Sequence, residues 1–205
     1  PEVPVGSSTR PRIRRGEGDV IQVRLELADV RPTIWRRLLV STRASLLELH
    51  GVIQRALGQD EAPQHAFEVD GVRYLDPDEP GDITTESTAL NSLALHPGAM
   101  LMHEVETEGE PWRHVLTVEQ VTPRLVGQRL PVCLDGGGAA PPDAVEGPTR
   151  YQHLLAALDA PLDARSAELR DWLPDGFDPG YVDLTAINAQ LARLPKHRPG
   201  NGREG

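Results

Sequence analysis

The sequence has 205 residues, and its 21 Lys and Arg against 31 Asp and Glu give a formal net charge of −10. This length fits one compact domain with appendages, and the negative charge disfavours bulk electrostatic binding to nucleic acid or to an anionic membrane. A single cysteine excludes an intrachain disulfide framework and a Cys-rich structural zinc site. No apolar run approaches the roughly 20 residues of a membrane span, so we expect a soluble, cytoplasmic protein. All basic residues but one are Arg, a bias typical of a high-GC bacterial genome.

Both ends of the chain have the composition of flexible segments. Residues 1–18 combine prolines, small residues and four arginines without apolar periodicity, which predicts a disordered basic arm. Such an arm could contact nucleic acid, and a short solvated leader has the same composition. Residues 195–205 are rich in Gly, Pro and charge and predict a flexible tail. A single folded domain is therefore expected over 19–194.

Two strands and a helix are expected first in this domain. Residues 20–27 alternate apolar and polar side chains, as a half-buried strand does, and 34–40 form a second strand, so the pair predicts a hairpin. Ser45 and Glu48 match a capping box. The apolar stripe that follows at helical spacing predicts a helix over 46–57.

The middle of the chain predicts further antiparallel strands. An Asp-Gly dipeptide divides 65–75 into two apolar runs, which indicates a tight hairpin. Residues 99–105 and 114–121 form another candidate strand pair. Residues 123–148 contain three consecutive glycines and no clear period, so we expect a long loop. A loop of this length in a compact domain is functional, disordered or wrapped over the core.

The C-terminal third is expected to be helical, since apolar side chains recur at spacings of three and four over 149–194. The expected element order is β-β-α-β-β-β-β followed by a C-terminal helical segment. This order predicts an α+β fold with a largely antiparallel sheet and a packed helix. Within the domain, 19–122 form the sheet and helix, 123–148 the loop and 149–194 the helices.

Histidines are the first candidates for chemistry. His50 lies on the predicted helix, His65 begins a predicted strand, and His103 and His114 lie on candidate neighbouring strands. No pair has the HExxH or HxH spacing that places two ligands on one metal. These residues could converge only through tertiary structure, so ordinary packed imidazoles and a catalytic or metal cluster both stay open.

Cys133 lies near Asp135 in the glycine-rich stretch. A cysteine nucleophile needs a histidine base and a cationic or helix-terminal environment that lowers its pKa, whereas a buried thiol is an inert small hydrophobe. The glycines do not match a phosphate-binding loop, because no GxxxxGK[ST] pattern is present. We expect no bound cofactor or metal. Arg36 and Arg37 are neighbours on a strand and must face opposite sides, so one can be exposed while the other pairs with a carboxylate.

An ordered set of motifs runs through the expected domain. The motifs are Pro32-Thr-Ile-Trp-Arg-Arg-Leu38, Leu46-Leu-Glu-Leu-His-Gly-Val-Ile-Gln54, His65-Ala-Phe-Glu-Val-Asp-Gly71, Trp112-Arg-His114, Pro131-Val-Cys-Leu-Asp-Gly136, Pro141-Pro142, Gly147-Pro148 and Phe177-Asp-Pro179. This set resembles the plasmid pRiA4b ORF-3-like family, which is also met as a passenger protein of insertion elements. The resemblance implies an α+β fold in which a hairpin, a helix and further strands precede a helical end, and it implies no settled activity.

Two motif tryptophans and two departures from the family matter for function. Trp35 and Trp112 match motif positions, and Trp112 could floor a pocket or close the core. Family members commonly carry an aromatic-rich stretch before the second tryptophan, where this chain has Glu-Thr-Glu-Gly-Glu-Pro. Members often carry a second cysteine seven positions after the first, where this chain has Ala140. A two-cysteine metal or redox site is therefore not available here.

From these observations we predict a non-catalytic binding or accessory module that recognises a protein or peptide partner, because an open antiparallel sheet offers edges and a face for partners. The candidate binding residues are Trp35, Arg36, Arg37, His50, His65, Trp112, His114, Cys133 and Asp135. One alternative is a metal-dependent or cysteine-based enzyme that uses the His, Cys and Asp members of this set around the 123–148 loop. The other is an accessory DNA-binding protein that uses the N-terminal arginines.

Overall fold

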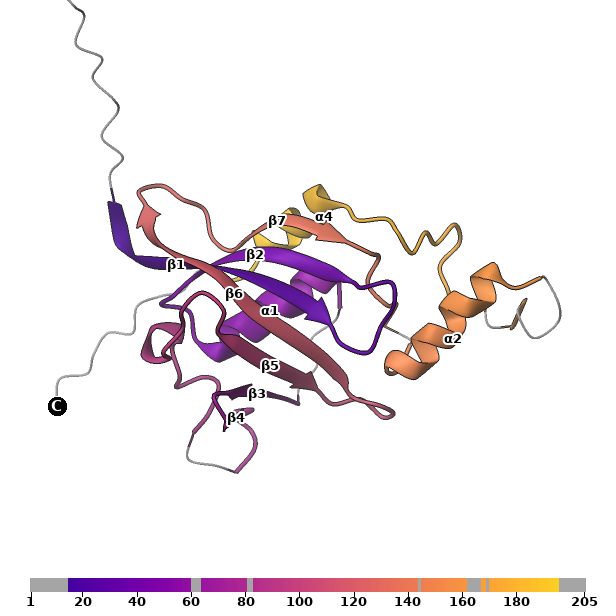
Figure 1. Cartoon of the computed structure of the whole chain (residues 1–205), viewed down its shortest axis with the longest axis horizontal. Helices are drawn as coiled ribbons and strands as arrows, with labels where there is room; N and C mark the ends of the chain where they lie inside the picture. Colours follow the sequence, from indigo (N-terminus) through magenta and orange to yellow (C-terminus); the bar gives the residue numbers. More distant parts are fainter. Residues whose placement is uncertain are drawn as a thin grey trace, which may run out of the picture.

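The computed structural model of the chain is shown in Figure 1. The residues it describes are 15–59, 64–80, 83–143, 145–161, 167–168 and 170–195. Most of the predicted basic arm, and with it the DNA-binding alternative, lies outside the described residues, as does the predicted tail beyond Pro195. The last residues assigned to the arm, from Arg15 onward, belong to the first strand instead.

Seven strands form one sheet in the order β4-β3-β5-β6-β1-β2-β7, and every neighbouring pair is antiparallel. The strands are β1 (Arg15–Leu27), β2 (Trp35–Ser41), β3 (His65–Val69), β4 (Val72–Leu75), β5 (Met100–Val105), β6 (Trp112–Leu125) and β7 (Val132–Gly137). The helices whose bounds lie within the described residues are α1 (Leu46–Leu57), α2 (Pro148–Asp159) and α4 (Leu184–Leu191), with a short 3-10 turn η1 at Leu90–Ser92. The α+β class and the antiparallel sheet are thereby confirmed.

Helix α1 forms over the residues that the sequence predicts, because local signals define both of its ends. The side chain of Ser45 accepts a hydrogen bond from the Glu48 amide while the Glu48 carboxylate accepts one from the Ser45 amide. Gly58 ends the helix in the left-handed conformation, with φ +69°, which costs glycine little.

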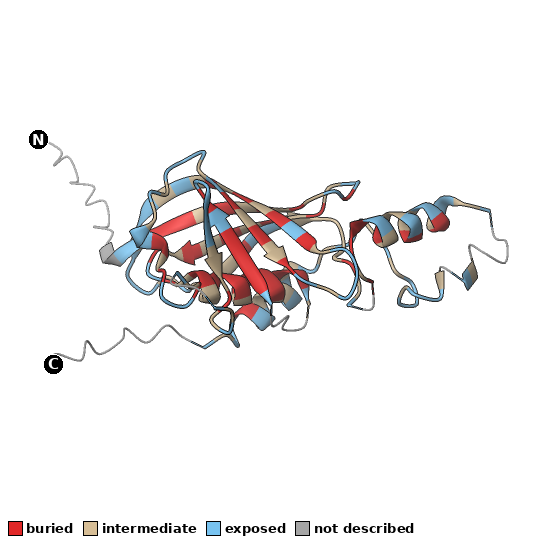
Figure 2. Ribbon diagram, turned by 90° about the horizontal axis from the view of Figure 1, so that it is seen from below, coloured by how far each residue is buried: buried red, intermediate tan, exposed pale blue. Residues whose placement is uncertain are grey.

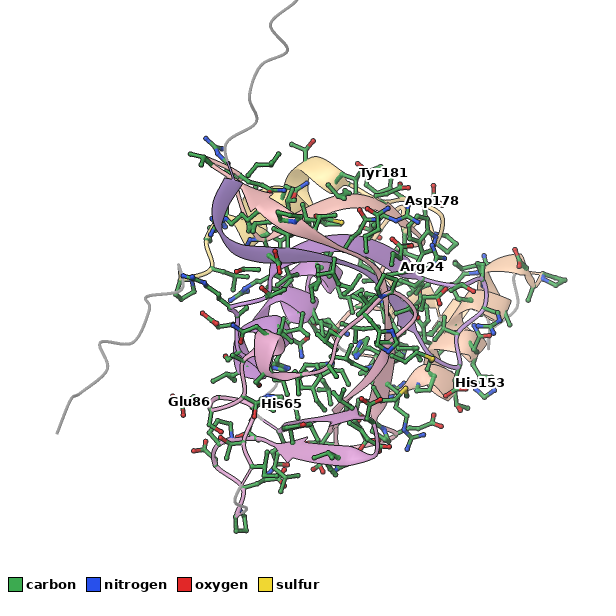
Figure 3. The ribbon with its side chains drawn as sticks, turned by 60° about the vertical axis from the view of Figure 1, so that its left-hand side comes forward. Arg24, His65, Glu86, His153, Asp178 and Tyr181 are labelled. Carbon is green, nitrogen blue, oxygen red and sulfur yellow. The ribbon has the colours of Figure 1, made fainter. Side chains whose placement is uncertain are left out.

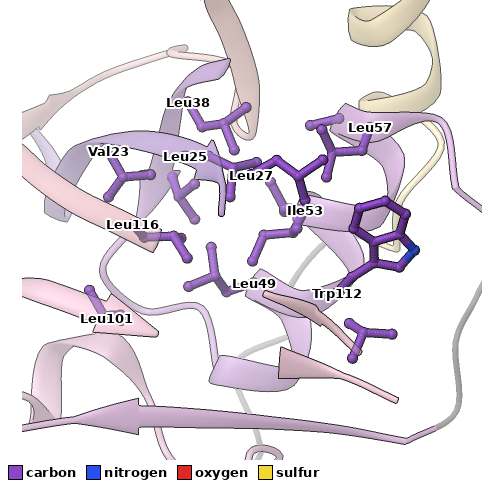
Figure 4. Packing of buried hydrophobic residues seen from close by; sticks show 14 of the residues in the cluster. Val23, Leu25, Leu27, Leu38, Leu49, Ile53, Leu57, Leu101, Trp112 and Leu116 are labelled. Carbon is purple, nitrogen blue, oxygen red and sulfur yellow. The ribbon is translucent and has the colours of Figure 1, made fainter. Parts of the chain in front are cut away.

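The core lies between α1 and one face of the sheet. Figure 2 shows α1 beneath the strands and α2 beyond their ends. Leu49 and Ile53 of α1 pack against buried side chains of the central strands, among them Leu25 of β1 and Leu116 of β6 (Figure 4). Among the described helices none covers the opposite face, which we call the open face (Figure 2). Its half-exposed side chains alternate with buried ones and include Gln22, Arg24, Glu26, Trp35, Arg37, Leu39, Val115, Thr117 and Glu119.

The segment 123–148 differs from the predicted long loop. Strand β6 continues to Leu125, and β7 forms inside the segment as the edge strand beside β2. The apolar alternation that marks a strand is missing because β7 ends in glycines. What completes β7 is a tertiary contact: the Asn188 side-chain amide on α4 accepts a hydrogen bond from the Cys133 amide at 2.8 Å and donates one to its carbonyl at 2.9 Å. One side chain thus occupies part of the outer edge of β7.

Within the described parts of the chain, every helix is too short or too polar to cross a lipid bilayer.

Candidate functional site

Four buried histidines meet between α1 and the β3-β5-β6 part of the sheet. His50 comes from α1, His65 from β3, His103 from β5 and His114 from β6. The β5–β6 register places His103 directly opposite His114, and β3 lies on the other side of β5. All four residues are buried, and His103 and His114 are completely so, at 0% exposed.

Three of these rings form a linear chain of short contacts, which we call the histidine chain. His50 Nδ1 lies 2.9 Å from His103 Nε2, and His103 Nδ1 lies 3.1 Å from His114 Nδ1. The central ring therefore uses its two nitrogens for two different neighbours. A metal ion would need one nitrogen from each ring directed at a common point, so this geometry is that of hydrogen-bonded imidazoles. Among the residues that the structure describes, no group of three or more His, Cys, Asp or Glu could hold a metal ion.

The fourth ring, His65, joins the histidine chain by stacking and connects it to a carboxylate. Its centroid lies 3.8 Å from that of His50, with 13° between the ring planes. His65 Nδ1 lies 2.7 Å from Asp76 Oδ2, and His65 Nε2 lies 3.1 Å from Thr85 Oγ1. Asp76 follows β4 and is itself buried. Figure 3 shows His65 on the β3 side of the molecule, well away from Arg24 on the open face.

Burial keeps His103 and His114, which we call the inner rings, neutral. Burial, and next the charge of nearby His50, lowers the pKa of His114 to about 3. Burial likewise holds the pKa of His103 well below its usual value, and repulsion from the other three histidines adds to the effect. A neutral imidazole has one donor and one acceptor, so the rings must be ordered in one direction along the chain. His114 Nε2, at the end of that chain, is buried without a hydrogen-bond partner among the described residues.

A second group of candidate residues surrounds β2 on the open face. The Arg37 guanidinium makes two hydrogen bonds to the Glu119 carboxylate, at 2.7 and 2.9 Å, and a longer contact of 3.3 Å to Asp135. The Glu119 hydrogen bond is the main cause that raises the pKa of Arg37. The Trp35 ring lies 4.1 Å from the Arg24 guanidinium carbon and 5.5 Å from that of Arg37.

Arg36 points to the opposite, buried side, as neighbours on a strand must. It is 3% exposed, and its hydrogen bonds go to main-chain carbonyls rather than to a carboxylate. Nε donates to Ala56 O at 3.1 Å, and Nη1 donates to the carbonyls of Trp35, Gly137 and Gly138 at 2.8, 3.2 and 3.0 Å. The Ala56 carbonyl belongs to the last turn of α1, where the helix dipole is negative. Burial still lowers the pKa of Arg36.

The glycines of β7 have a structural explanation. A Cβ on Gly136 would lie 2.9 Å from Arg36 Cδ, and one on Gly137 would lie 2.5 Å from Trp35 Nε1. The β2 side chains therefore lie directly against the β7 backbone, and only glycine allows this approach.

Cys133 and Asp135 are not brought to the histidines. They lie on β7, which β2 and β1 separate from β6, and three strand spacings amount to about 14 Å. Burial raises the pKa of the Cys133 thiol, and Sγ contacts the Asp135 carbonyl at 3.4 Å. Trp112 is buried at the start of β6 and belongs to the hydrophobic core. The nine candidates thus fall into a histidine group, a β2–β7 group and one core residue.

Four residues in these groups were not among the candidate binding residues, although His103 was considered with the other histidines. They are His103, Asp76, Glu119 and Asn188. A hairpin register that pairs Val105 with Trp112 would have placed His103 opposite His114, so that contact had a local signal. Asp76 had a similar signal, since it lies 11 residues from His65 across the β3–β4 hairpin. Glu119 and Asn188 had none, because their partners are 82 and 55 residues away in the chain.

The fold is that of an α+β protein with an open antiparallel sheet. Similarity to known proteins shows to which family of this class the chain belongs. The chain belongs to the plasmid pRiA4b ORF-3-like family, whose model matches residues 19–186. It is 31% identical over 180 residues to uncharacterized protein y4hQ of Sinorhizobium fredii, covering 86% of this chain and 89% of that protein. A crystal structure of a protein of unknown function, MM3350 from Methanosarcina mazei Go1, superposes with a TM-score of 0.72 at 26% identity, covering 81% of this chain and 96% of that one. The resemblance found in the sequence is confirmed.

Proposed function

We propose that this protein is a non-catalytic binding or accessory module that recognises a protein or peptide partner through the open face of its sheet, centred on Trp35. The observation that carries the proposal is the stacking of the Arg24 guanidinium on the Trp35 ring at 4.1 Å, on a sheet face that no described helix covers. Tryptophan and arginine are the residue types in which interfaces concentrate their binding energy.

The site is held in place before any partner arrives. Glu119 fixes the Arg37 guanidinium with two hydrogen bonds, and the Trp35 ring lies directly against the Gly137 backbone. Rigid anchors of this kind lose little conformational entropy on binding. A partner that places an apolar or planar side chain on the Trp35 ring, and polar groups beside the surrounding charges, matches this surface.

The chain offers a matched control for a test of this face. Trp172, in the C-terminal segment, also carries an arginine, with the Arg150 guanidinium carbon 4.1 Å from its ring. It is 44% exposed and lies outside the sheet. The variants Trp35→Ala and Trp172→Ala therefore remove the same kind of pair from two different surfaces.

The experiment captures partners with the tagged full chain, purifies the retained protein or peptide, and measures its Kd for both variants by calorimetry. We expect Trp35→Ala to weaken binding roughly 30-fold, the effect of losing about 2 kcal/mol at a central anchor, and Trp172→Ala to leave it nearly unchanged. Circular dichroism verifies that both variants are folded. Equal affinity of Trp35→Ala and the parent chain, or a parent chain that retains no partner, would contradict the proposal.

A further inference from the structure

The histidine chain is a polar connection between α1 and the β3-β5-β6 part of the sheet. The contact of His50 Nδ1 with His103 Nε2 joins α1 to β5, and the stack of His50 on His65 joins it to β3. Around these rings the interface is apolar, with Leu49 and Ile53 on the helix side. The hold of α1 on this part of the sheet therefore depends on the protonation state of the rings.

The folded arrangement has no provision for a charge on the two inner rings. The charged groups that act on His103 are the other three histidines, and the one that acts on His114 is His50. The acidic group at this interface, Asp76 after β4, contacts His65 rather than the inner pair. Both inner rings are 0% exposed, so a proton on either would be a buried charge beside other imidazoles.

We infer that the histidine chain is an acid-operated latch: when His103 and His114 take up protons, α1 separates from β3, β5 and β6. A state that exposes these rings can bind protons at a pH at which the packed state cannot. Acid therefore shifts the population toward the exposed state.

The opening is local because a different contact holds the other end of α1. Arg36 donates to the Ala56 carbonyl in the last turn of the helix and to the carbonyls of Gly137, the last residue of β7, and Gly138, the next residue. These hydrogen bonds contain no group that titrates between pH 5 and pH 7. The first turns of α1, which carry His50, therefore open while the last turn stays on β2 and β7.

Hydrogen exchange of the full-length chain, read by mass spectrometry and corrected for the intrinsic pH dependence of exchange, tests the latch. Between pH 6 and pH 5 we expect the opening constant of amides in α1, β3 and β5 to rise more than tenfold per pH unit, because opening takes up more than one proton. At both pH values, amides of β1 and β2 should have smaller opening constants than those amides, because they exchange only when the whole domain unfolds. Opening constants in β1 and β2 as large as those in α1, or a rise of tenfold per pH unit or less in α1, would overturn the inference.

Three variants assign the protons. Glutamine can donate and accept hydrogen bonds but does not titrate, so His103→Gln and His114→Gln should each reduce the steepness by close to tenfold per pH unit. Either variant decides the question if the other does not fold. His153→Gln is the matched control and should leave the steepness unchanged. His153 lies exposed on α2, away from the histidine chain (Figure 3). Full steepness in a folded His103→Gln or His114→Gln protein would show that the inner rings are not the latch.

Discussion

Replacement of Arg36 by leucine tests how a buried cation is stabilised without a carboxylate. The side chain is 3% exposed and donates through Nε to one carbonyl and through Nη1 to three. Three acceptors share one nitrogen, so we count two effective charged hydrogen bonds, each worth about 1.5–3 kcal/mol. Their loss costs about 3–6 kcal/mol. Burial of the leucine side chain offsets about 2 kcal/mol of this, so we expect Arg36→Leu to lower the free energy of unfolding by about 1–4 kcal/mol.

Urea denaturation followed by circular dichroism measures this change, and the neighbouring arginine is the control. Arg37 lies on the same strand but faces the open side, where water screens its ion pairs with Glu119 and Asp135. We expect Arg37→Leu to destabilise the protein much less than Arg36→Leu. Equal losses for the two variants, or a loss below about 1 kcal/mol for Arg36→Leu, would refute the reasoning, since apolar packing could then replace the buried cation.

Three further outcomes follow from the contacts described above. Lowering the pH from 7 to 5 should reduce the free energy of unfolding by about 2 kcal/mol through His114 alone. The pKa of His114 is about 3 in the folded protein and near 6.5 in the unfolded chain, so only the unfolded chain gains the proton. Denaturation curves that coincide at the two pH values would contradict this. Gly137→Ala should displace Trp35, since the new Cβ would lie 2.5 Å from Nε1, and cost about 1–3 kcal/mol; an unshifted fluorescence spectrum and unchanged thermal stability would count against it. Asn188→Ala should cost about 1–3 kcal/mol because it leaves the Cys133 main chain unpaired at the sheet edge; light scattering should also detect association through that edge, whereas Asn188→Gln serves as the polar control.

Local signals made part of the fold predictable. The helix over 46–57 could be predicted to the residue because its capping box, its apolar stripe and its terminal glycine lie within one short segment. The 65–75 hairpin was predictable for the same reason, since an Asp-Gly turn joins its two strands. Strand β7 was not predictable, because its glycines are required by close contacts with Trp35 and Arg36 on another strand.

The candidate site follows the same division. His103 and His114 are 11 residues apart across a hairpin, so a correct register would have revealed their contact. His50 and His103 are 53 residues apart, and no spacing rule connects a helix residue with a strand residue at that distance. The alternative of a site that combines His, Cys and Asp therefore joins residues that the structure separates. His50, His65 and His114 lie together, whereas Cys133 and Asp135 lie apart from them on β7.

The pairing of β1 with β6 at the centre of the sheet has a consequence for synthesis of the chain. Gln22 on β1 and Glu119 on β6 are hydrogen-bonded partners although 97 residues separate them. During synthesis, β1, β2 and α1 therefore leave the ribosome long before β6, which completes the middle of the sheet. Until β6 has been synthesised, the edge of β1 that pairs with it stays unpaired. We expect stalled nascent chains that end before Trp112 to be cut readily by protease within β1 and β2, and chains whose β6 has left the ribosome to resist. We therefore expect the centre of the sheet to form only after β6 has been synthesised.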